Sequence, residues 1–261
     1  NDGKALDARL CDDVNYITGY WRNNGLSIWK DLSTNGNDSE TPTGSETLLI
    51  PAGIDGSRDS QGFVMNKHRD TSSLNFPASS IRESGLGVDI NNTPELTFGT
   101  GDFTLEAWAK AGYTQQPGGG SYSSFNTIIS LGENVVGNDV AAISYYGSVN
   151  KFRFHCGADT YQYIHDTDVV TKGNWYHVVA GRASGVGFLY LNGVAQDNKH
   201  GTYNISGTNI NNTEKKTVGY DSGNTARNYT EPIDSVRIYG DALSETEVKR
   251  NYNATKSSHR N

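Results

Sequence analysis

The sequence predicts an all-β protein made of two stacked antiparallel sheets, with one short helix near its C-terminus. Three observations support this fold class. Short segments rich in aromatic and β-branched residues recur along the chain, with turn residues between them. The 261 residues include 30 Gly and 15 Tyr but only 6 Pro, which is typical of short strands joined by polar turns. Residues 174–194 also carry a clear β-hairpin pattern.

This hairpin pattern has two apolar faces. Its strands are Trp175 to Ala180 and Phe188 to Leu191, and Asn192-Gly193 offers a tight turn because both residues tolerate positive φ. Alternation places Val178, Ala180, Leu189 and Leu191 on one face, and Trp175, His177, Val179, Phe188 and Tyr190 on the other. We therefore expect a central strand pair that is covered on both sides.

Other short segments are predicted to form the remaining strands. They are residues 48–51, 73–76, 87–90, 95–98, 102–111, 127–131, 140–146, 151–156, 161–164, 216–220 and 233–239. Residues 102–111 alternate best, with Phe103, Leu105, Ala107 and Ala109 on one face and Thr104, Glu106, Trp108 and Lys110 on the other.

One helix is predicted after residue 244. Ser244 is a good N-cap, and Glu247 completes a capping box three residues later. Leu243, Val248 and Tyr252 can then press the helix onto the sandwich.

The chain divides into three parts. Residues 1–45 lack sustained alternation and form either an extra strand and loop on the same domain or an arm that reaches a neighbouring molecule. Residues 46–254 contain the strands and the helix, and residues 255–261 form a polar tail that is expected to fray. No stretch approaches the roughly 20 apolar residues of a membrane span.

Three segments together resemble one family. GDFTLEAWAK (101–110), NWYHVVAGRASGVGFLYLNGV (174–194) and IDSVRIYGDALSETEVKRNY (233–252) resemble the laminin-G-like, concanavalin A-like jelly rolls of the LamG/pentraxin group. WKDLSTNGND (29–38) resembles a loop that often precedes this module, and NYNATK (251–256) looks most like the phage and bacterial surface members. The resemblance implies a two-sheet antiparallel jelly roll with a concave face and loops at one rim. Its members include lectins, adhesion modules, appendages of enzymes and structural proteins of phages.

Charge and cysteine content narrow the function classes. The net charge of −7 argues against nucleic acid as a partner, because phosphate binding needs clustered Lys and Arg. Asn1 in place of Met, without an apolar signal segment, fits a processed protein at an extracellular, cell or virion surface, and it equally fits a chain trimmed at its N-terminus. Cys11 and Cys156 are either two unpaired thiols or one bridge, which would contribute about 4–5 kcal/mol in the chain-entropy model.

Catalytic patterns are weak in this sequence. A retaining glycanase needs two carboxylates about 5–5.5 Å apart. Enzymes of the family that this chain resembles often carry E-x-D-x-E along one strand. Here Asp102 is the only other acidic residue on the predicted strand of Glu106. We expect Glu106 to be solvated or to pair with a neighbouring Arg or Lys, and His177 to be structural, with no carboxylate placed near it by the sequence. The protein is therefore predicted not to be an enzyme.

Two places are candidate calcium sites. Asp31, Ser33 and Asn35 alternate as oxygen ligands, but Pro42 stands where a bidentate Glu would complete the loop, so an Asx-rich turn is the alternative. Asp234 shares a face with Val236 and Ile238 by alternation, and the resemblance implies an acid here near a structural calcium. The alternative for Asp234 is a carboxylate that accepts backbone N–H bonds at the start of a strand.

Polar and aromatic loop residues are candidates for glycan binding, since aromatic faces stack on sugar rings and Asp or Asn bind hydroxyls. They are Tyr113, Tyr122, Tyr220, Asp221, Asn224 and Tyr229, and ordinary surface packing is their alternative role. Six N-x-S/T sequons are N-glycosylation candidates, at Asn37, Asn91, Asn204, Asn211, Asn228 and Asn253. A chain so rich in Asn, Ser and Thr has about this many by chance.

The function predicted from these features is a non-catalytic, extracellular structural or adhesive subunit. We expect it to associate with itself, as a repeated subunit of a surface filament or a virion appendage. The alternative is a calcium-dependent lectin that binds glycans. A polysaccharide-active enzyme that uses Glu106 is the third hypothesis.

Overall fold

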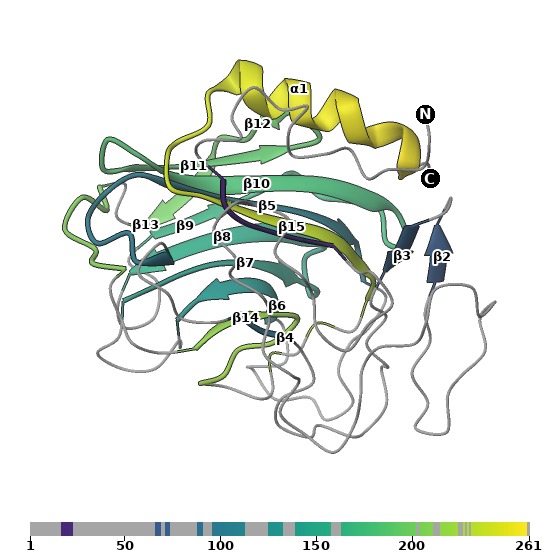
Figure 1. The fold of residues 1–261 in the computed structure, drawn as a ribbon, viewed down its shortest axis with the longest axis horizontal. Helices are drawn as coiled ribbons and strands as arrows, with labels where there is room; N and C mark the ends of the chain where they lie inside the picture. Colours follow the sequence, from purple (N-terminus) through teal and green to yellow (C-terminus); the bar gives the residue numbers. More distant parts are fainter. Residues whose placement is uncertain are drawn as a thin grey trace.

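Two antiparallel sheets lie face to face in the computed structural model of the chain, and a helix crosses the outer face of one of them (Figure 1). The structure describes residues 17–22, 66–68, 71–73, 88–90, 96–112, 125–132, 139–157, 163–201, 204–210, 215–223, 227, 229 and 231–259, and the numbers of strands and contacts refer to these. The arrangement confirms the predicted jelly-roll sandwich with one short C-terminal helix.

Both sheets have purely antiparallel neighbours within the described residues. The six-stranded sheet has the order β1 (Ile17–Arg22), β15 (Ile233–Tyr239), β5 (Phe103–Lys110), β10 (Trp175–Ala183), β11 (Val186–Leu191) and β12 (Val194–Ala195). The seven-stranded sheet has the order β13 (Asn198–Gly201), β9 (Tyr163–Asp166), β8 (Lys151–Gly157), β7 (Val140–Tyr146), β6 (Phe125–Leu131), β14 (Lys216–Val218) and β4 (Val88–Ile90). A separate hairpin pairs β2 (Asn66–His68) with β3 (Thr71–Ser73).

The core lies between the sheets because the inward side chains of both are apolar. Leu105 and Val178 from the six-stranded sheet are fully buried together with Ile143 and Phe154 from the other sheet. Each such side chain contributes roughly 1.5–3 kcal/mol by leaving water. The faces predicted by alternation are confirmed, since Phe103, Leu105, Ala107 and Ala109 all belong to this core.

The predicted hairpin is confirmed, and it contains two tight turns in succession. Ser184 and Gly185 have φ values of 49° and 78°, and they connect the paired residues of β10 and β11. Asn192 and Gly193 have φ values of 52° and 80°, and they connect β11 to β12. Positive φ at both central residues is the requirement of a type I′ turn, which suits Asn and Gly.

Helix α1 (Glu245–Thr255) begins as predicted. The hydroxyl of Ser244 accepts a hydrogen bond from Glu247 N, and the Glu247 carboxylate accepts one from Ser244 N at 2.6 Å. The helix lies across the outer face of the six-stranded sheet (Figure 1). There it covers a second apolar cluster, made of Val179, Tyr239, Leu243 and Val248.

Arg182 is a charged residue that is completely buried at the end of the inner face of β10. Its guanidinium donates hydrogen bonds to the carbonyl oxygens of Gly99 (2.8 Å), Gly101 (2.8 Å), Ile205 (3.2 Å) and Thr208 (2.6 Å). These bonds connect two irregular segments, residues 99–101 and 205–208, to the centre of the sheet. A buried cation needs such partners because desolvation alone would cost several kcal/mol.

Several sequence expectations differ from the structure. Within residues 95–98, the described residues 96–98 are not a strand: Leu96 and Phe98 are packed on the core, while Gly99 makes an isolated bridge to Ile210. Pro94 and the glycines at 99 and 101 explain this, since Pro and Gly disfavour regular pairing. The short strands β2, β12 and β13 were not predicted, whereas β1 lies in the N-terminal segment for which an extra strand was one alternative. Residues 48–51 lie outside the described part.

The two ends of the described chain lie on the six-stranded sheet. β1, from the N-terminal segment, pairs with β15 of the same chain, with Tyr20 opposite Arg237. The expected fraying of the tail from residue 255 is wrong for residues 255–259, because Thr255 and His259 are both buried. No helix in the described part of the chain has the length and apolar character that crossing a membrane requires.

Candidate functional site

A pocket lies on the outer face of the six-stranded sheet, where the end of α1 meets the β10–β11 hairpin. Strand register places its floor: Trp108 of β5 lies opposite His177 of β10, and Glu106 lies opposite Val179. All four side chains point away from the core, toward α1. The sheet therefore presents the carboxylate of Glu106, the imidazole of His177 and the indole of Trp108 directly beneath the helix.

The last turn of α1 is anchored to this floor. Trp108 Nε1 donates a hydrogen bond to Thr255 Oγ1 at 2.9 Å, and Thr255 Oγ1 donates to Asn251 O at 2.7 Å. Trp108 also stacks on Tyr252, with ring centroids 6.0 Å apart. The helix is thus positioned by a buried hydrogen bond as well as by apolar packing.

His259 closes one side of the pocket. Its ring stacks on Trp108 with centroids 3.9 Å apart and planes 5° from parallel, and it meets Trp175 edge to face at 5.3 Å. His259 Nδ1 lies 3.1 Å from Thr255 O, and Nε2 lies 2.9 Å from Asp234 Oδ2. Both ring nitrogens therefore lie within hydrogen-bond distance of an oxygen atom, which fixes the orientation of the imidazole.

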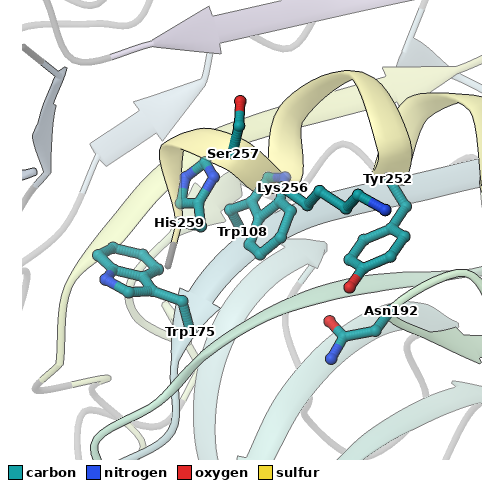
Figure 2. Close-up of a pocket in the computed structure, with 7 residues that line it drawn as sticks. All are labelled: Trp108, Trp175, Asn192, Tyr252, Lys256, Ser257 and His259. Carbon is teal, nitrogen blue, oxygen red and sulfur yellow. The ribbon is translucent and has the colours of Figure 1, made fainter. Parts of the chain in front are cut away.

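The pocket has a volume of about 390 Å³ and is lined by Trp108, Trp175, Asn192, Tyr252, Lys256, Ser257 and His259 (Figure 2). This volume lies at the lower end of the roughly 300–1,000 Å³ typical of small-molecule sites. Trp108 and Trp175 are nearly buried, so Tyr252 provides the most accessible aromatic ring. Asn192 comes from the tight turn after β11, and its Oδ1 accepts a hydrogen bond from His177 N at 2.9 Å.

A buried polar cluster lies beneath the pocket and centres on Glu106. Arg237 Nη1 donates a hydrogen bond to Glu106 Oε1, and His177 Nε2 lies 3.1 Å from the same oxygen. The hydroxyl of Tyr239 and the amide of Asn251 both donate to Glu106 Oε2 at 2.9 Å. Burial by itself would raise the pKa of Glu106, but Arg237 and these neighbours outweigh it and hold the pKa well below its ordinary value.

The surroundings of Glu106 agree with its predicted pairing with an Arg or Lys. They place the Glu106 carboxylate beside His177, where the sequence had placed none, and leave the predicted structural role of His177 unchanged. A carboxylate that is buried, ionised and bonded on both oxygens has no free position for a substrate proton. The arrangement is therefore structural in character.

Asp234 lies in a β-bulge. Ile233 pairs with Ala109 and Ser235 pairs with the neighbouring Trp108, so β15 holds one extra residue at this point. The bulge turns Asp234 to the outer face, where it contacts His259, and the prediction that it shares a face with Val236 and Ile238 is wrong. Its partner is an imidazole rather than backbone N–H groups.

Calcium binding stays a prediction. The described residues include no group of three or more His, Cys, Asp or Glu side chains that could converge on an ion. Asp31, Ser33 and Asn35 lie outside the described residues.

Three predicted glycan-binding residues are buried and use their polar groups inside the protein, which corrects their expected place in surface loops. The Tyr220 hydroxyl donates to Asp89, and the Tyr229 hydroxyl donates to the carbonyl of Lys110. Asp221 forms an ion pair with Arg227 at 3.0 Å. Tyr113, Tyr122 and Asn224 lie outside the described residues.

The structure places the modification candidates as follows. Cys156 is buried and has no disulfide partner among the described residues. Its suggested partner Cys11 lies outside them, so their bridge stays a prediction. Burial raises the pKa of Cys156 to about 12. Asn204 and Asn253 are exposed, whereas Asn37, Asn91, Asn211 and Asn228 are not described. Glycosylation at any of them stays a prediction.

The pocket residues themselves were missed by sequence reasoning. Strand alternation already placed Trp108 and Trp175 on outward faces, and the Asn192-Gly193 turn was identified. Lys256 and His259 carried no signal, because they belong to the segment expected to fray. Only the stacking of His259 on Trp108 shows that this segment helps to form a site.

The outer face of the seven-stranded sheet carries buried polar side chains, among them Ser144, Arg153, His155 and Asp166. Arg153 forms a two-point hydrogen-bonded pair with Asp166, at 2.5 and 2.9 Å. Burial, followed by the charges of Arg227 and Arg153, lowers the pKa of His155 to about 3. The folded protein therefore keeps this imidazole neutral at pH values where an unfolded chain protonates it.

His155→Gln is expected to flatten the loss of stability between pH 6.5 and 5. In this window the imidazole of His155 binds a proton in the unfolded state but not in the folded state. The free energy of unfolding therefore decreases by up to about 1.4 kcal/mol for each unit by which the pH is lowered. Urea unfolding of both proteins at pH 7, 6 and 5 measures this slope. Ordinary carboxylates titrate below the window, so equal slopes in the two proteins would contradict the role given to His155.

A known protein family and several solved structures match this chain. The family described as "Concanavalin A-like lectin/glucanases superfamily" matches residues 84–249, which confirms the resemblance inferred from the sequence. A search of the curated proteins gave no match.

Solved structures share this fold at low sequence identity. The binding domain of Paraclostridial Mosquitocidal Protein 1 has 17% identity and a TM-score of 0.61, over 92% of this chain and 52% of that one. Trypanosoma rangeli sialidase in complex with sialic acid has 15% identity and a TM-score of 0.60, over 93% of this chain and 33% of that one. The third structure is domain 4 of AbnA, a GH43 extracellular arabinanase from Geobacillus stearothermophilus, in complex with arabinotriose. It has 16% identity and a TM-score of 0.56, over 90% of this chain and 97% of that one. The chain thus spans about half of the first protein and a third of the second, and the likeness shows the fold alone.

Proposed function

Because this chain belongs to the concanavalin A-like lectin/glucanase superfamily, we propose that it is a non-catalytic module that binds a glycan in the pocket beside α1. The observation that carries the proposal is the combination of a half-buried tyrosine ring with polar groups around one small cavity. Within the described residues, no hydrogen bond engages the hydroxyl of Tyr252 or the amide nitrogen of Asn192. Both groups are therefore available to a sugar.

The role of Glu106 supports a binding function rather than catalysis. Its carboxylate is neutralised by Arg237 and held by Tyr239 and Asn251, below the floor of the pocket. Glycoside hydrolysis needs a pair of carboxyl groups facing the substrate, and none of the seven described lining residues is acidic. Domain 4 of the arabinanase, whose structure contains arabinotriose, is an example of a relative in fold with a bound sugar.

Tyr252→Ala is expected to weaken glycan binding about tenfold, because loss of the ring removes stacking worth about 0.5–1.5 kcal/mol together with the hydroxyl contact. A glycan array identifies the ligand, and titration calorimetry then measures the affinity of both proteins. Tyr252→Phe is the matched control, since it keeps the ring and should retain most of the affinity. Absence of any bound glycan, or equal binding by Tyr252→Ala, would contradict the proposal.

Repeating the glycan array with a chelator distinguishes calcium-independent binding in this pocket from the hypothesis of a calcium-dependent lectin. The groups that line the pocket are side chains of the protein itself, so we expect binding to survive chelation. Loss of binding with the chelator would instead support calcium at Asp31 or another predicted ligand. An extracellular location is part of the proposal, and the exposed sequons at Asn204 and Asn253 are compatible with it.

A repeated subunit of a filament is the second candidate. The observation in its favour is that β1, a strand from the N-terminal segment, forms the edge of the six-stranded sheet against β15. An edge strand distant in sequence is the kind of element that subunits exchange to polymerise. Sedimentation of the same sample over a wide concentration range tests it, and a monomer at all concentrations would exclude this candidate.

A further inference from the structure

We propose that the pocket selects sugars that carry a carboxylate, and that Lys256 recognises this charge. The inference rests on the proposed glycan-binding function and narrows the class of ligand. It is carried by the polar groups that the protein leaves available around the cavity.

Several of the hydrogen-bonding groups around the pocket are already engaged within the protein. Asn192 Oδ1 accepts the hydrogen bond of His177 N, which fixes the amide and leaves its NH₂ group for a ligand. Trp108 Nε1 donates to Thr255, and both nitrogens of His259 are engaged by Thr255 and Asp234. The groups that can still donate a hydrogen bond to a ligand are the NH₂ group of Asn192 and the ammonium group of Lys256, together with the hydroxyl of Tyr252.

Lys256 holds its positive charge at the mouth of the pocket. Its backbone N–H caps α1 by donating to Tyr252 O, so the side chain starts from a fixed point. Nζ lies 5.4 Å from the centre of the Tyr252 ring and donates to Asn253 Oδ1 at 2.7 Å. Figure 2 shows the side chain running from the end of the helix toward Tyr252. An ammonium group has three donors, so it can bind a carboxylate while keeping this contact.

The charge balance around the pocket is positive although the chain carries a net charge of −7. The seven described lining residues include Lys256 and no Asp or Glu. Two carboxylates on the same face of the sheet are engaged inside the protein: Glu106 is neutralised by Arg237, and Asp234 contacts His259. One cation with two or three neutral donors matches a monoanion that accepts only, and an ionised carboxylate is such a group.

The test compares a uronic-acid oligosaccharide with the same oligosaccharide after reduction of its carboxyl groups to alcohols, by titration calorimetry at low salt. We expect the reduced form to bind about tenfold more weakly, as for a lost charge-assisted hydrogen bond. Lys256→Gln should lower affinity for the acidic form to that for the reduced form. Lys249→Gln on the same helix is the matched control, because Lys249 is exposed and paired with Glu245, and it should change affinity less than twofold.

The outcomes separate the two proposals. If the acidic and reduced oligosaccharides bind equally, or only neutral glycans bind, the selection for carboxylate is wrong and the glycan-binding function stands. If only sulfated glycans bind, charge is recognised but the ligand class is wrong. If no glycan binds at all, the proposed function itself fails. Melting temperatures of both lysine variants show whether the fold is intact, and the exposure of both side chains predicts that it is.

Discussion

Glu106→Gln is expected to lower the free energy of unfolding by about 3–5 kcal/mol, the usual cost of leaving a buried charge without its partner. The change preserves the shape of the side chain but removes the negative charge that Arg237 faces in the interior. Tyr239 and Asn251 would also lose a charged acceptor. Urea unfolding at pH 7 measures the effect. Glu245→Gln removes an exposed ion pair with Lys249 on α1 and should change stability by no more than about 0.5 kcal/mol.

The contribution of Glu106 also has a defined pH dependence. Because its pKa in the folded protein lies well below the ordinary value of 4.5, its contribution is fully present above that value. It is lost as the pH falls below 4.5 toward the folded pKa, so the stabilities of the wild type and Glu106→Gln should converge in acid. A variant within about 1 kcal/mol of the wild type at pH 7 would contradict the assigned role. Cleavage of a polysaccharide by the wild type, abolished in a folded Glu106→Gln, would instead support the enzyme hypothesis.

Arg182→Met is expected to have an effect of similar size, about 3–5 kcal/mol, for a different reason. Methionine keeps the aliphatic part of the side chain but removes the donors that satisfy the carbonyl oxygens of Gly99, Gly101, Ile205 and Thr208. Buried carbonyls without donors cost free energy individually. Residues 99–101 and 205–208 should therefore loosen before the sheets do.

Chemical unfolding measures the loss of stability in Arg182→Met, and hydrogen exchange locates it. The amides of Ile205 and Ile210, which bond to Gly185 O and Gly99 O, should exchange faster in the variant, while amides of β7 should not. Arg182→Lys is the informative comparison, because an ammonium group reaches fewer carbonyls than a planar guanidinium and should recover only part of the stability. A loss below about 1 kcal/mol with unchanged exchange would contradict this role.

Local patterns in the sequence predicted the features that depend on neighbouring residues. The alternation of β5 and β10 predicted both faces correctly, because side chains in a strand alternate whatever the partner strand is. The capping box at Ser244 and the turn at Asn192-Gly193 were also predicted, since each depends on residues within four positions. The family resemblance rested on these same segments, which is why the family match confirms it.

Features that depend on contacts between distant residues were predicted poorly. Asp234 was assigned to the wrong face, because alternation across a β-bulge fails and a bulge has no reliable sequence signal. Tyr220 and Tyr229 were expected in surface loops, but their hydroxyls bond to Asp89 and to the carbonyl of Lys110, more than 100 positions away. The segment after residue 254 is polar and was expected to fray. Thr255 and His259 are buried because they contact Trp108 and, for His259, also Asp234.

The amino-acid sequence alone thus determined the all-β class, the inward and outward faces of the main strands and the start of the helix, because each is decided by short-range periodicity and hydrogen bonding. Only the tertiary structure decided which polar groups meet. Glu106 became a buried structural anion because β10, β15 and α1 bring His177, Arg237 and Asn251 around it. The pocket formed because His259, at the C-terminal end, stacks on Trp108, and long-range packing of this kind leaves no trace in the pattern of neighbouring residues.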